Sequence, residues 1–248
     1  MRDASGAAHR RFTGRFGAGI GGLAGLDAAG APAERYRAFC RALDAELAAG
    51  GRQPGAVTIV GISKKQPPAA VAEAIAAGLK DVGENYLQEA RAKFGLLPPV
   101  RKHFVGHLQT NKAKAVAELF DVVQSVDRLE AATALARAAQ ALGKRLPVLL
   151  QLNVSPYERF GCDPHDANRL AEAIRALPGL RLEGVMAVGP LGDRGEPARA
   201  FELAAKTFAR VGGSTLSIGM SGDWREAVRA GSTMVRIGTA LFGGRENR

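Results

Sequence analysis

Residues 57–67 read VTIVGISKKQP, an uncharged apolar run that ends abruptly at Ser63, Lys64 and Lys65. A run this short and this rich in β-branched residues predicts a strand buried on both faces, because a half-buried strand would alternate polar with apolar residues. Such strands are typical of parallel α/β folds, in which ligands bind at the carboxyl ends of the strands. Lys64 is therefore either a solvated charge at a strand end or an amine held for chemistry, most often an imine with a carbonyl cofactor.

Strand and helix signals alternate along the rest of the chain. The starts of successive strands are separated by about 19 to 36 residues, which is enough for one crossover helix and two loops. Eight such units predict an α/β fold with a single closed (β/α)8 TIM barrel. The strand candidates lie at residues 57–63, 81–85, 103–107, 122–126, 146–153, 182–188, 215–220 and 234–242.

An additional helix is predicted before the first strand. Apolar residues recur at helical spacing over residues 32–49, and Gly50 and Gly51 end the pattern. We expect the apolar stripe of this helix to cover the bottom or the flank of the barrel, or to contact another subunit. Asp127, Asp163 and Ser221 are the expected N-caps of three later helices.

Composition limits the classes of function. With 248 residues, 46% of them hydrophobic, the chain can form one large core, and it has no uncharged apolar stretch long enough for a membrane span. Two cysteines far apart, without a CxxC motif, argue against a disulfide framework or a zinc site and fit a reducing cytosol, so we expect a cytoplasmic protein. The net charge of +10 invites an anionic partner, but three Tyr and one Trp offer little base stacking, which disfavours nucleic acid.

Residues 1–30 differ from the rest because Gly, Ala and Arg dominate and no apolar face recurs. Gly17, Gly19 and Gly22 satisfy G-x-G-x-x-G, but no strand precedes them, so a dinucleotide loop is not indicated. We expect a flexible N-terminal extension over residues 1–30 and the barrel over residues 31–248.

The informative polar residues fall at the carboxyl ends of the predicted strands. They include Glu84 and Asn85 after the second strand, His107 and Gln109 after the third, and Asn153 after the fifth. Two later segments, 217–221 (SIGMS) and 236–239 (RIGT), are typical of a phosphate cradle, since small residues admit close backbone approach and Ser217, Ser221 and Thr239 supply hydroxyl donors. The alternative is that these Gly and Ser residues merely form tight turns. His103 and His107 lack a third ligand, so no metal site is expected.

A lysine facing a phosphate cradle suggests pyridoxal 5′-phosphate (PLP). Here the segments VGISKKQP, DVGENYLQE, HFVGHLQTNK, LSIGMSGD and GSTMVRIGTALFG resemble, in order, the motifs of the YggS/PROSC-type pyridoxal phosphate homeostasis proteins. The resemblance spans about residues 31 to 244. It implies a barrel similar to the N-terminal domain of alanine racemase.

The same resemblance implies a role for each matched residue. Lys64 would hold PLP as a Schiff base, and Asn85 would lie beside the ring. Arg236 would face the pyridine nitrogen. Ser217, Ser221, Gly238 and Thr239 would bind the phosphate. Two departures stand out: the family usually has S-K-T-K-P where this chain has Ser63 to Pro67 as SKKQP, and often Lys-Ser where it has Arg159 and Phe160.

The resemblance further implies a non-catalytic protein that buffers or delivers PLP, with indirect effects on amino- and keto-acid pools and transient contacts with PLP-dependent apo-enzymes. Alanine racemase uses a second base from a further β-rich domain, whereas this sequence ends at Arg248 soon after the last strand, so we expect no such domain. A guanidinium opposite the ring nitrogen also weakens the electron sink. The alternative is a PLP-dependent racemase or lyase of the same fold. A closed barrel gives no reason to require an oligomer, so we expect a monomer.

Overall fold

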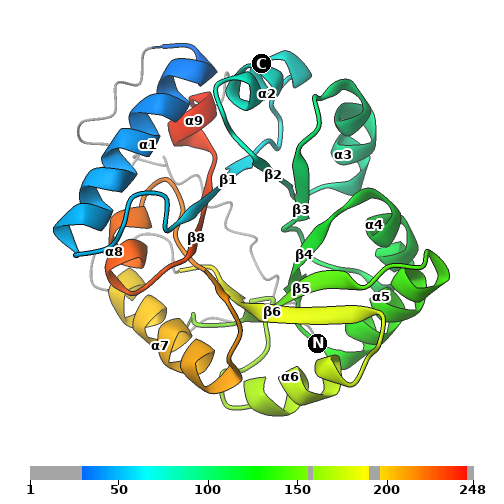
Figure 1. Cartoon of the computed structure of the whole chain (residues 1–248). Helices are drawn as coiled ribbons and strands as arrows, with labels where there is room; N and C mark the ends of the chain where they lie inside the picture. Colours follow the sequence, from blue (N-terminus) through cyan, green and yellow to red (C-terminus); the bar gives the residue numbers. More distant parts are fainter. Residues whose placement is uncertain (1–29, 156–158, 190–195, 245–248) are drawn as a thin grey trace, which may run out of the picture.

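Eight parallel strands close into a barrel in the computed structural model, which describes residues 30–155, 159–189 and 196–244 (Figure 1). Each strand pairs with its neighbours in sequence, and β8 closes the ring by pairing with β1. The strands are β1 (Thr58–Ile62), β2 (Asp81–Glu84), β3 (Arg101–Phe104), β4 (Val122–Val126), β5 (Leu146–Leu152), β6 (Leu180–Ala187), β7 (Thr215–Ser217) and β8 (Met234–Ile237). The predicted (β/α)8 barrel is confirmed.

Helices surround the barrel on its outer side, as Figure 1 shows. They are α1 (Pro32–Ala49), α2 (Pro68–Ala76), α3 (Leu87–Lys93), α4 (Ala113–Leu119), α5 (Leu129–Ala141), α6 (Ala167–Arg175), α7 (Glu196–Val211), α8 (Trp224–Arg229) and α9 (Thr239–Phe242), with short 3-10 turns at Phe94–Leu96 and Thr110–Lys112. The predicted extension at residues 1–30 lies outside the described residues, apart from Gly30.

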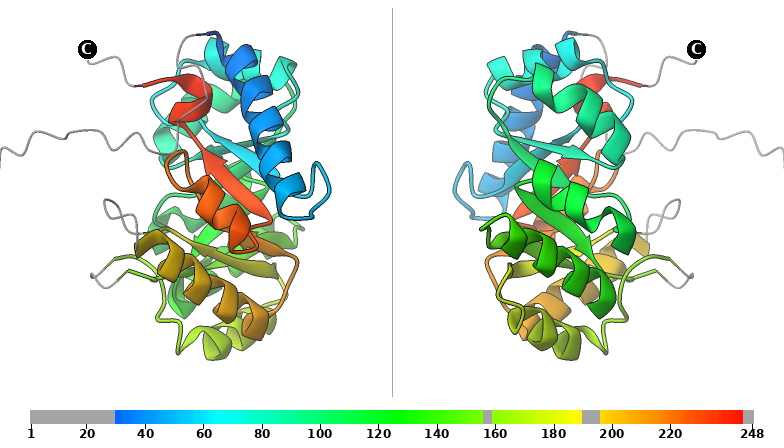
Figure 2. Two further views of the ribbon diagram at one scale, coloured as in Figure 1. Left: turned by 90° about the vertical axis from the view of Figure 1, so that its left-hand side faces the viewer. Right: turned by 90° about the vertical axis from the view of Figure 1, so that its right-hand side faces the viewer.

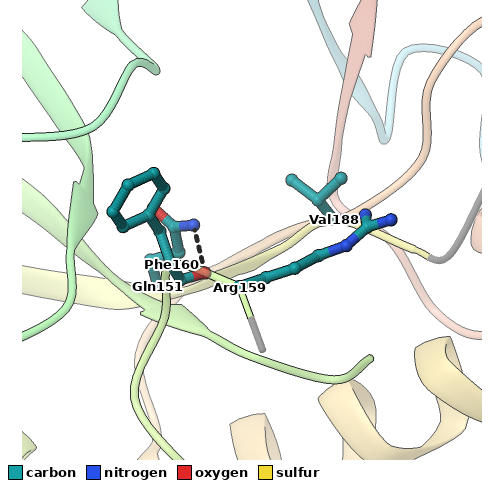
Figure 3. A pocket seen from close by; sticks show the side chains of 4 residues that line it. All are labelled: Gln151, Arg159, Phe160 and Val188. Carbon is teal, nitrogen blue, oxygen red and sulfur yellow. Dashed lines mark hydrogen bonds between the residues drawn. The ribbon is translucent and has the colours of Figure 1, made fainter. Parts of the chain in front are cut away.

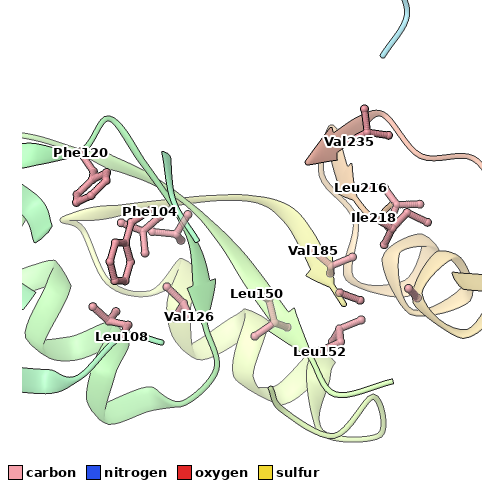
Figure 4. Close-up of a cluster of buried hydrophobic side chains, with 14 of the residues drawn as sticks. Phe104, Leu108, Phe120, Val126, Leu150, Leu152, Val185, Leu216, Ile218 and Val235 are labelled. Atoms are coloured by element: carbon pink, nitrogen blue, oxygen red, sulfur yellow. The ribbon is translucent and has the colours of Figure 1, made fainter. Parts of the chain in front are cut away.

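The apolar core lies between the outer face of the sheet and the helices. Figure 4 shows part of it, including Phe104, Phe120 and Leu150, which are at most 2% exposed. The rings of Phe104 and Phe120 pack edge to face with their centroids 5.1 Å apart. Burial of the whole apolar core, of which these side chains are a part, supplies most of the driving force for folding.

Helix α1 lies along the flank of the barrel, beside α9, α2 and α8 (Figures 1 and 2). Its buried stripe consists of Phe39, Leu43 and Leu47, and the ring of Phe39 contacts Trp224 edge to face at 5.1 Å between centroids. The helix occupies the residues predicted for it. It covers the flank of the barrel, which was one of the positions expected from the sequence.

Three predicted N-caps are wrong, because each side chain bonds elsewhere. The helices begin one to three residues later than expected, with Arg128, Asp166 and Asp223 as the N-cap residues. Asp163 instead accepts a hydrogen bond from the backbone N–H of His165. Asp127 pairs with Arg128, and Ser221 accepts hydrogen bonds from the loop after β8.

The predicted last strand, 234–242, is too long. Strand β8 ends at Ile237, and residues 239–242 form α9, in which the N–H groups of Leu241 and Phe242 donate to the carbonyl of Gly238. Strand β3 likewise runs over 101–104 rather than 103–107. Short apolar runs do not distinguish a strand from a helical turn by periodicity.

Candidate functional site

Lys64 lies in the turn that follows β1, at the mouth where the carboxyl ends of all eight strands meet. Strand β1 ends at Ile62, so Lys64 and Lys65 belong to the turn rather than to the strand. Lys64 is half-buried, whereas Lys65 is exposed and has a positive φ of 59°. Among the described residues, the side chain of Lys64 has no hydrogen-bond or ion-pair partner. It is therefore an amine that the fold leaves available.

A buried ion pair lies beside this turn. Glu84, the last residue of β2, and Lys93, near the end of α3, are 0% and 6% exposed, and Lys93 Nζ lies 2.9 Å from Glu84 Oε2. Lys93 also donates to the carbonyl oxygen of Ser63, and the hydroxyl of Ser63 donates to Glu84 at 2.9 Å. The sequence did not predict this pair, because Glu84 and Lys93 are nine residues apart and lie on different elements; the i,i+4 spacing indicates only the neighbouring pair of Glu89 and Lys93.

Asn85 follows β2 and is half-buried, and its side-chain amide has no hydrogen-bond partner in the part of the chain that the structure describes. The backbone carbonyl oxygen of Asn85 would lie 1.9 Å from a Cβ at Gly106, so the loop after β3 requires glycine at position 106. This close approach holds the backbone of Asn85 against the loop after β3, and the pairing of β2 with β1 places Asn85 beside the β1 turn.

The loops after β7 and β8 present unpaired donors. The backbone N–H groups of Ser221, Gly222 and Thr239 form no hydrogen bond with any described residue. The hydroxyl oxygen of Ser221 accepts from the N–H groups of Gly238 and Ala240 at 3.2 and 3.3 Å, which ties the two loops together and leaves its O–H free to donate. A Cβ at Gly238 would lie 3.7 Å from the carbonyl oxygen of Ile62, so this group of donors lies against the end of β1.

Arg236 lies inside the barrel, 5% exposed. Its guanidinium donates to the carbonyl and hydroxyl oxygens of Ser217 and to the carbonyl oxygen of Ala187, at 2.7 to 2.8 Å. Its Nε–H has no partner among the described residues. Burial lowers the pKa of Arg236 to about 10, with the nearby Asp223 opposing the shift, so the group remains a cation at neutral pH.

A polar chain continues from Arg236 across the barrel interior. Because arginine only donates, the Ser217 hydroxyl accepts from Arg236 and donates to Gln124 Oε1 at 2.7 Å. The Gln124 amide nitrogen must then donate to His103 Nδ1 at 2.9 Å, which leaves His103 Nε2–H to donate to Asp81 at 2.8 Å. The network thus fixes both the amide orientation and the histidine tautomer.

The structure brings most of the site residues expected from the sequence to one side of the barrel mouth. Lys64, Asn85, Ser221, Gly238 and Thr239 follow β1, β2, β7 and β8, strands that are neighbours in the barrel. Ser217 differs, because its hydroxyl is buried and engaged with Arg236 and Gln124. Its expected contact with phosphate stays a prediction, and the structure shows instead that it supports Arg236.

His107 lies at the opposite side of the mouth, after β3. Its ring stacks on Phe160 with centroids 3.7 Å apart, and its Nδ1 is 3.8 Å from Asp127 Oδ2. Burial lowers the pKa of His107, an effect that Asp127 opposes. His103 is buried in the interior network, and within the described ranges no group of three His, Cys, Asp or Glu side chains is placed to hold a metal ion.

A cavity of about 590 Å³ lies beside Phe160 and is lined by Gln151, Arg159, Phe160 and Val188 (Figure 3). Gln151 donates to the carbonyl oxygen of Phe160 at 2.9 Å, and Arg159 extends toward Val188. Arg159 and Phe160, one of the two departures from the family pattern, therefore line this cavity. Over residues 30–155, 159–189 and 196–244, every helix is too short or too polar to cross a membrane.

Comparison with known proteins defines the class of this barrel. A sequence profile described as "Alanine racemase, N-terminal domain" matches residues 59–246. A solved structure of a protein of unknown function from Bifidobacterium adolescentis is 32% identical, with a TM-score of 0.79, and the match covers 85% of this chain and 94% of that one. The fold is the barrel of the alanine racemase N-terminal domain.

Relatives with higher sequence identity and a named role define the family within this fold class. The pyridoxal phosphate homeostasis protein of Pseudomonas aeruginosa is 47% identical over 204 residues, covering 80% of this chain and 89% of that protein. PipY of Synechococcus elongatus, solved with PLP bound, is 35% identical with a TM-score of 0.75, and the match covers 86% of this chain and all of PipY. The chain belongs to the family of pyridoxal phosphate homeostasis proteins.

Proposed function

We propose that this protein binds PLP covalently at Lys64 and acts as a non-catalytic carrier or regulator of that cofactor. The observation that carries the proposal is the half-buried Lys64, without a partner among the described residues, next to a loop pair with unpaired backbone donors. PLP needs both parts, since its aldehyde condenses with a primary amine and its phosphate needs N–H and O–H donors. The PLP-bound structure of PipY, a relative 35% identical, supports the choice of cofactor.

The phosphate would be held by the loops after β7 and β8. The unpaired N–H groups of Ser221, Gly222 and Thr239, with the hydroxyls of Ser221 and Thr239, match the acceptor oxygens of a phosphate dianion. A Cβ at Gly222 would meet nothing within 4 Å, so there is open space beside these donors. Gly238 would contribute by keeping the β8 loop close to β1.

The pyridine ring would lie between Asn85 and Arg236. The Nε–H of Arg236, without a partner among the described residues, is the donor that the chain offers to a ring nitrogen. PLP, when bound, supplies an aldehyde for amines and an electron-withdrawing ring. An arginine with a pKa of about 10 donates to the ring nitrogen without giving it a proton at neutral pH, so the ring withdraws electrons weakly.

This weak electron sink favours a carrier over an amino-acid racemase or lyase. A carrier would buffer PLP, deliver it during transient contacts with PLP-dependent apo-enzymes, and act as a monomer in the cytoplasm. The relatives named pyridoxal phosphate homeostasis proteins support a role in regulating the cofactor.

A turnover and transfer experiment tests this choice. We expect the PLP-loaded protein to convert neither L- nor D-alanine nor threonine at a steady rate. For the transfer arm, the wild type and Lys64→Ala are each incubated with PLP and freed of unbound cofactor. We expect the wild type to restore the activity of a PLP-dependent apo-enzyme faster than Lys64→Ala does. Steady turnover of an amino acid that Lys64→Ala abolishes would contradict the carrier and favour the enzyme.

A further inference from the structure

The turn that carries Lys64 is held from both sides by three residues of β2 and α3, namely Glu84, Glu89 and Lys93, here called the β2–α3 cluster. We propose that this cluster positions Lys64 and thereby sets the rate at which Lys64 condenses with the aldehyde of PLP. The inference rests on the proposed function and adds to it the residues that make Lys64 reactive. In the condensation the amine nitrogen attacks the aldehyde carbon, a carbon–nitrogen double bond forms and one water leaves.

The residue before Lys64 is held by the buried half of the cluster. Ser63 is fully buried, and its backbone N–H donates to the carbonyl of Gly83 at 2.9 Å. Its hydroxyl donates to Glu84, and its carbonyl accepts from Lys93, whose ammonium also pairs with Glu84 at 2.9 Å. All the polar groups of Ser63 are therefore bonded to β2 or α3, so Ser63 cannot rotate without breaking its hydrogen bonds to both members of a buried ion pair.

The residue after Lys64 is held by Glu89. Lys65 adopts a left-handed conformation with φ of 59°, which costs energy for a residue with a Cβ. Its N–H donates to Glu89 Oε2 at 2.6 Å, and the same oxygen lies 3.8 Å from Lys93 Nζ. Lys93 thus links the contacts on both sides of Lys64.

The cluster leaves Lys64 itself untouched. Neither Glu84 nor Glu89 pairs with the Lys64 ammonium, although both bond to its immediate neighbours. A paired lysine would have to break an ion pair before attacking an aldehyde, whereas this arrangement fixes the backbone and leaves the amine available. The strained turn next to an available amine is what a positioning role predicts.

Glu89 is the residue to vary, because its side chain is 32% exposed and its removal leaves the buried pair of Glu84 and Lys93 intact. The carbon–nitrogen double bond between PLP and Lys64 should give a visible absorption band. We expect Glu89→Ala to slow the appearance of this band on mixing with PLP by about 10- to 100-fold, since small displacements of a reacting group have effects of this size. Affinity for pyridoxamine 5′-phosphate, which has no aldehyde, should be unchanged in calorimetry. Glu89→Gln, which retains an oxygen for the Lys65 N–H, should restore most of the rate.

Glu202→Ala is a matched control, because Glu202 forms an i,i+4 ion pair with Lys206 on α7 in the same way that Glu89 pairs with Lys93. It should react at the wild-type rate. Amide hydrogen exchange gives a second readout: the Lys65 N–H should exchange faster in Glu89→Ala than in the wild type or Glu89→Gln.

Two results would overturn the positioning role alone: Glu89→Ala reacting as fast as Glu202→Ala, or losing affinity for pyridoxamine 5′-phosphate as much as it loses rate. A wild-type protein that binds pyridoxamine 5′-phosphate but never forms the visible band with PLP would overturn the covalent role of Lys64 as well. The two failures are therefore distinguishable.

Discussion

The stack of His107 on Phe160 shows how one side chain sets the chemistry of another at the barrel mouth. Phe160 is 61% exposed, yet its ring lies 3.7 Å from that of His107, between centroids, and covers one face of it. An apolar ring does not replace the water that an imidazolium requires, so the neutral histidine is favoured. This agrees with the lowered pKa of His107, whose main cause is burial.

We expect the pKa of His107 in the native protein to lie below 6.5 and to rise toward that value in Phe160→Ala, because removal of the ring readmits water. Since the folded pKa is the lower one, the stability that this residue contributes is present above pH 6.5 and is lost as the pH falls through the folded pKa. A histidine NMR titration, assigned with His107→Gln, measures the shift. Leu96→Ala, at another exposed apolar residue, should leave the His107 titration unchanged.

Lys64 was predictable from the sequence, but its surroundings were not. The position of a lysine after a buried strand follows from local pattern. The contacts of Ser63 and Lys65 with Glu84 and Glu89 join residues that are 21 and 24 apart, and depend on how α3 packs after β2. The engagement of Ser217 with Gln124 joins residues 93 apart, so a hydroxyl that resembled a phosphate ligand in the sequence supports an arginine in the structure.

At the scale of elements, strands were predicted better than their ends. Each predicted strand exists, because apolar runs separated by crossover-length segments leave few alternatives. The ends failed where a side chain had two possible partners, as with Asp163, which bonds to His165 instead of capping α6, or where Gly238 divides one apolar run into β8 and α9. These choices are made by tertiary contacts.

The polar chain through the interior links five strands, β8, β7, β4, β3 and β2, and Gln124 on β4 is its centre. We expect Gln124→Leu to lower the free energy of unfolding by about 1–3 kcal/mol for each of the two groups left unpaired, the Ser217 hydroxyl and His103 Nδ1. Urea denaturation measures this loss. Gln140→Leu, on the exposed face of α5, makes the same change in side chain and should have little effect; an equal loss in both variants would contradict the role of the network.

At the scale of the whole molecule, closure of the barrel brings together parts distant in sequence. Lys64 follows β1 and Gly238 follows β8, yet the two strands pair directly, so the first and last βα loops become neighbours. Within the described residues, the mouth then has an amine and backbone donors without partners on one side, and His107, Phe160 and a cavity on the other. The proposed binding of PLP uses the side that carries Lys64 and the loops after β7 and β8.

Covalent binding of PLP at Lys64 can be observed by absorption spectroscopy, because an imine of PLP absorbs visible light. The wild type, Lys64→Ala and Lys65→Ala are each mixed with PLP, and their absorption spectra are recorded before and after reduction with borohydride. The lysine that carries the reduced PLP label is then identified by mass spectrometry. We expect the wild type to show a visible band that borohydride abolishes and to carry the label on Lys64. Lys65→Ala should behave in the same way, and Lys64→Ala should show neither the band nor a label at this turn. A wild-type protein that takes up PLP without the band, or that carries the label on Lys65, would contradict covalent binding at Lys64.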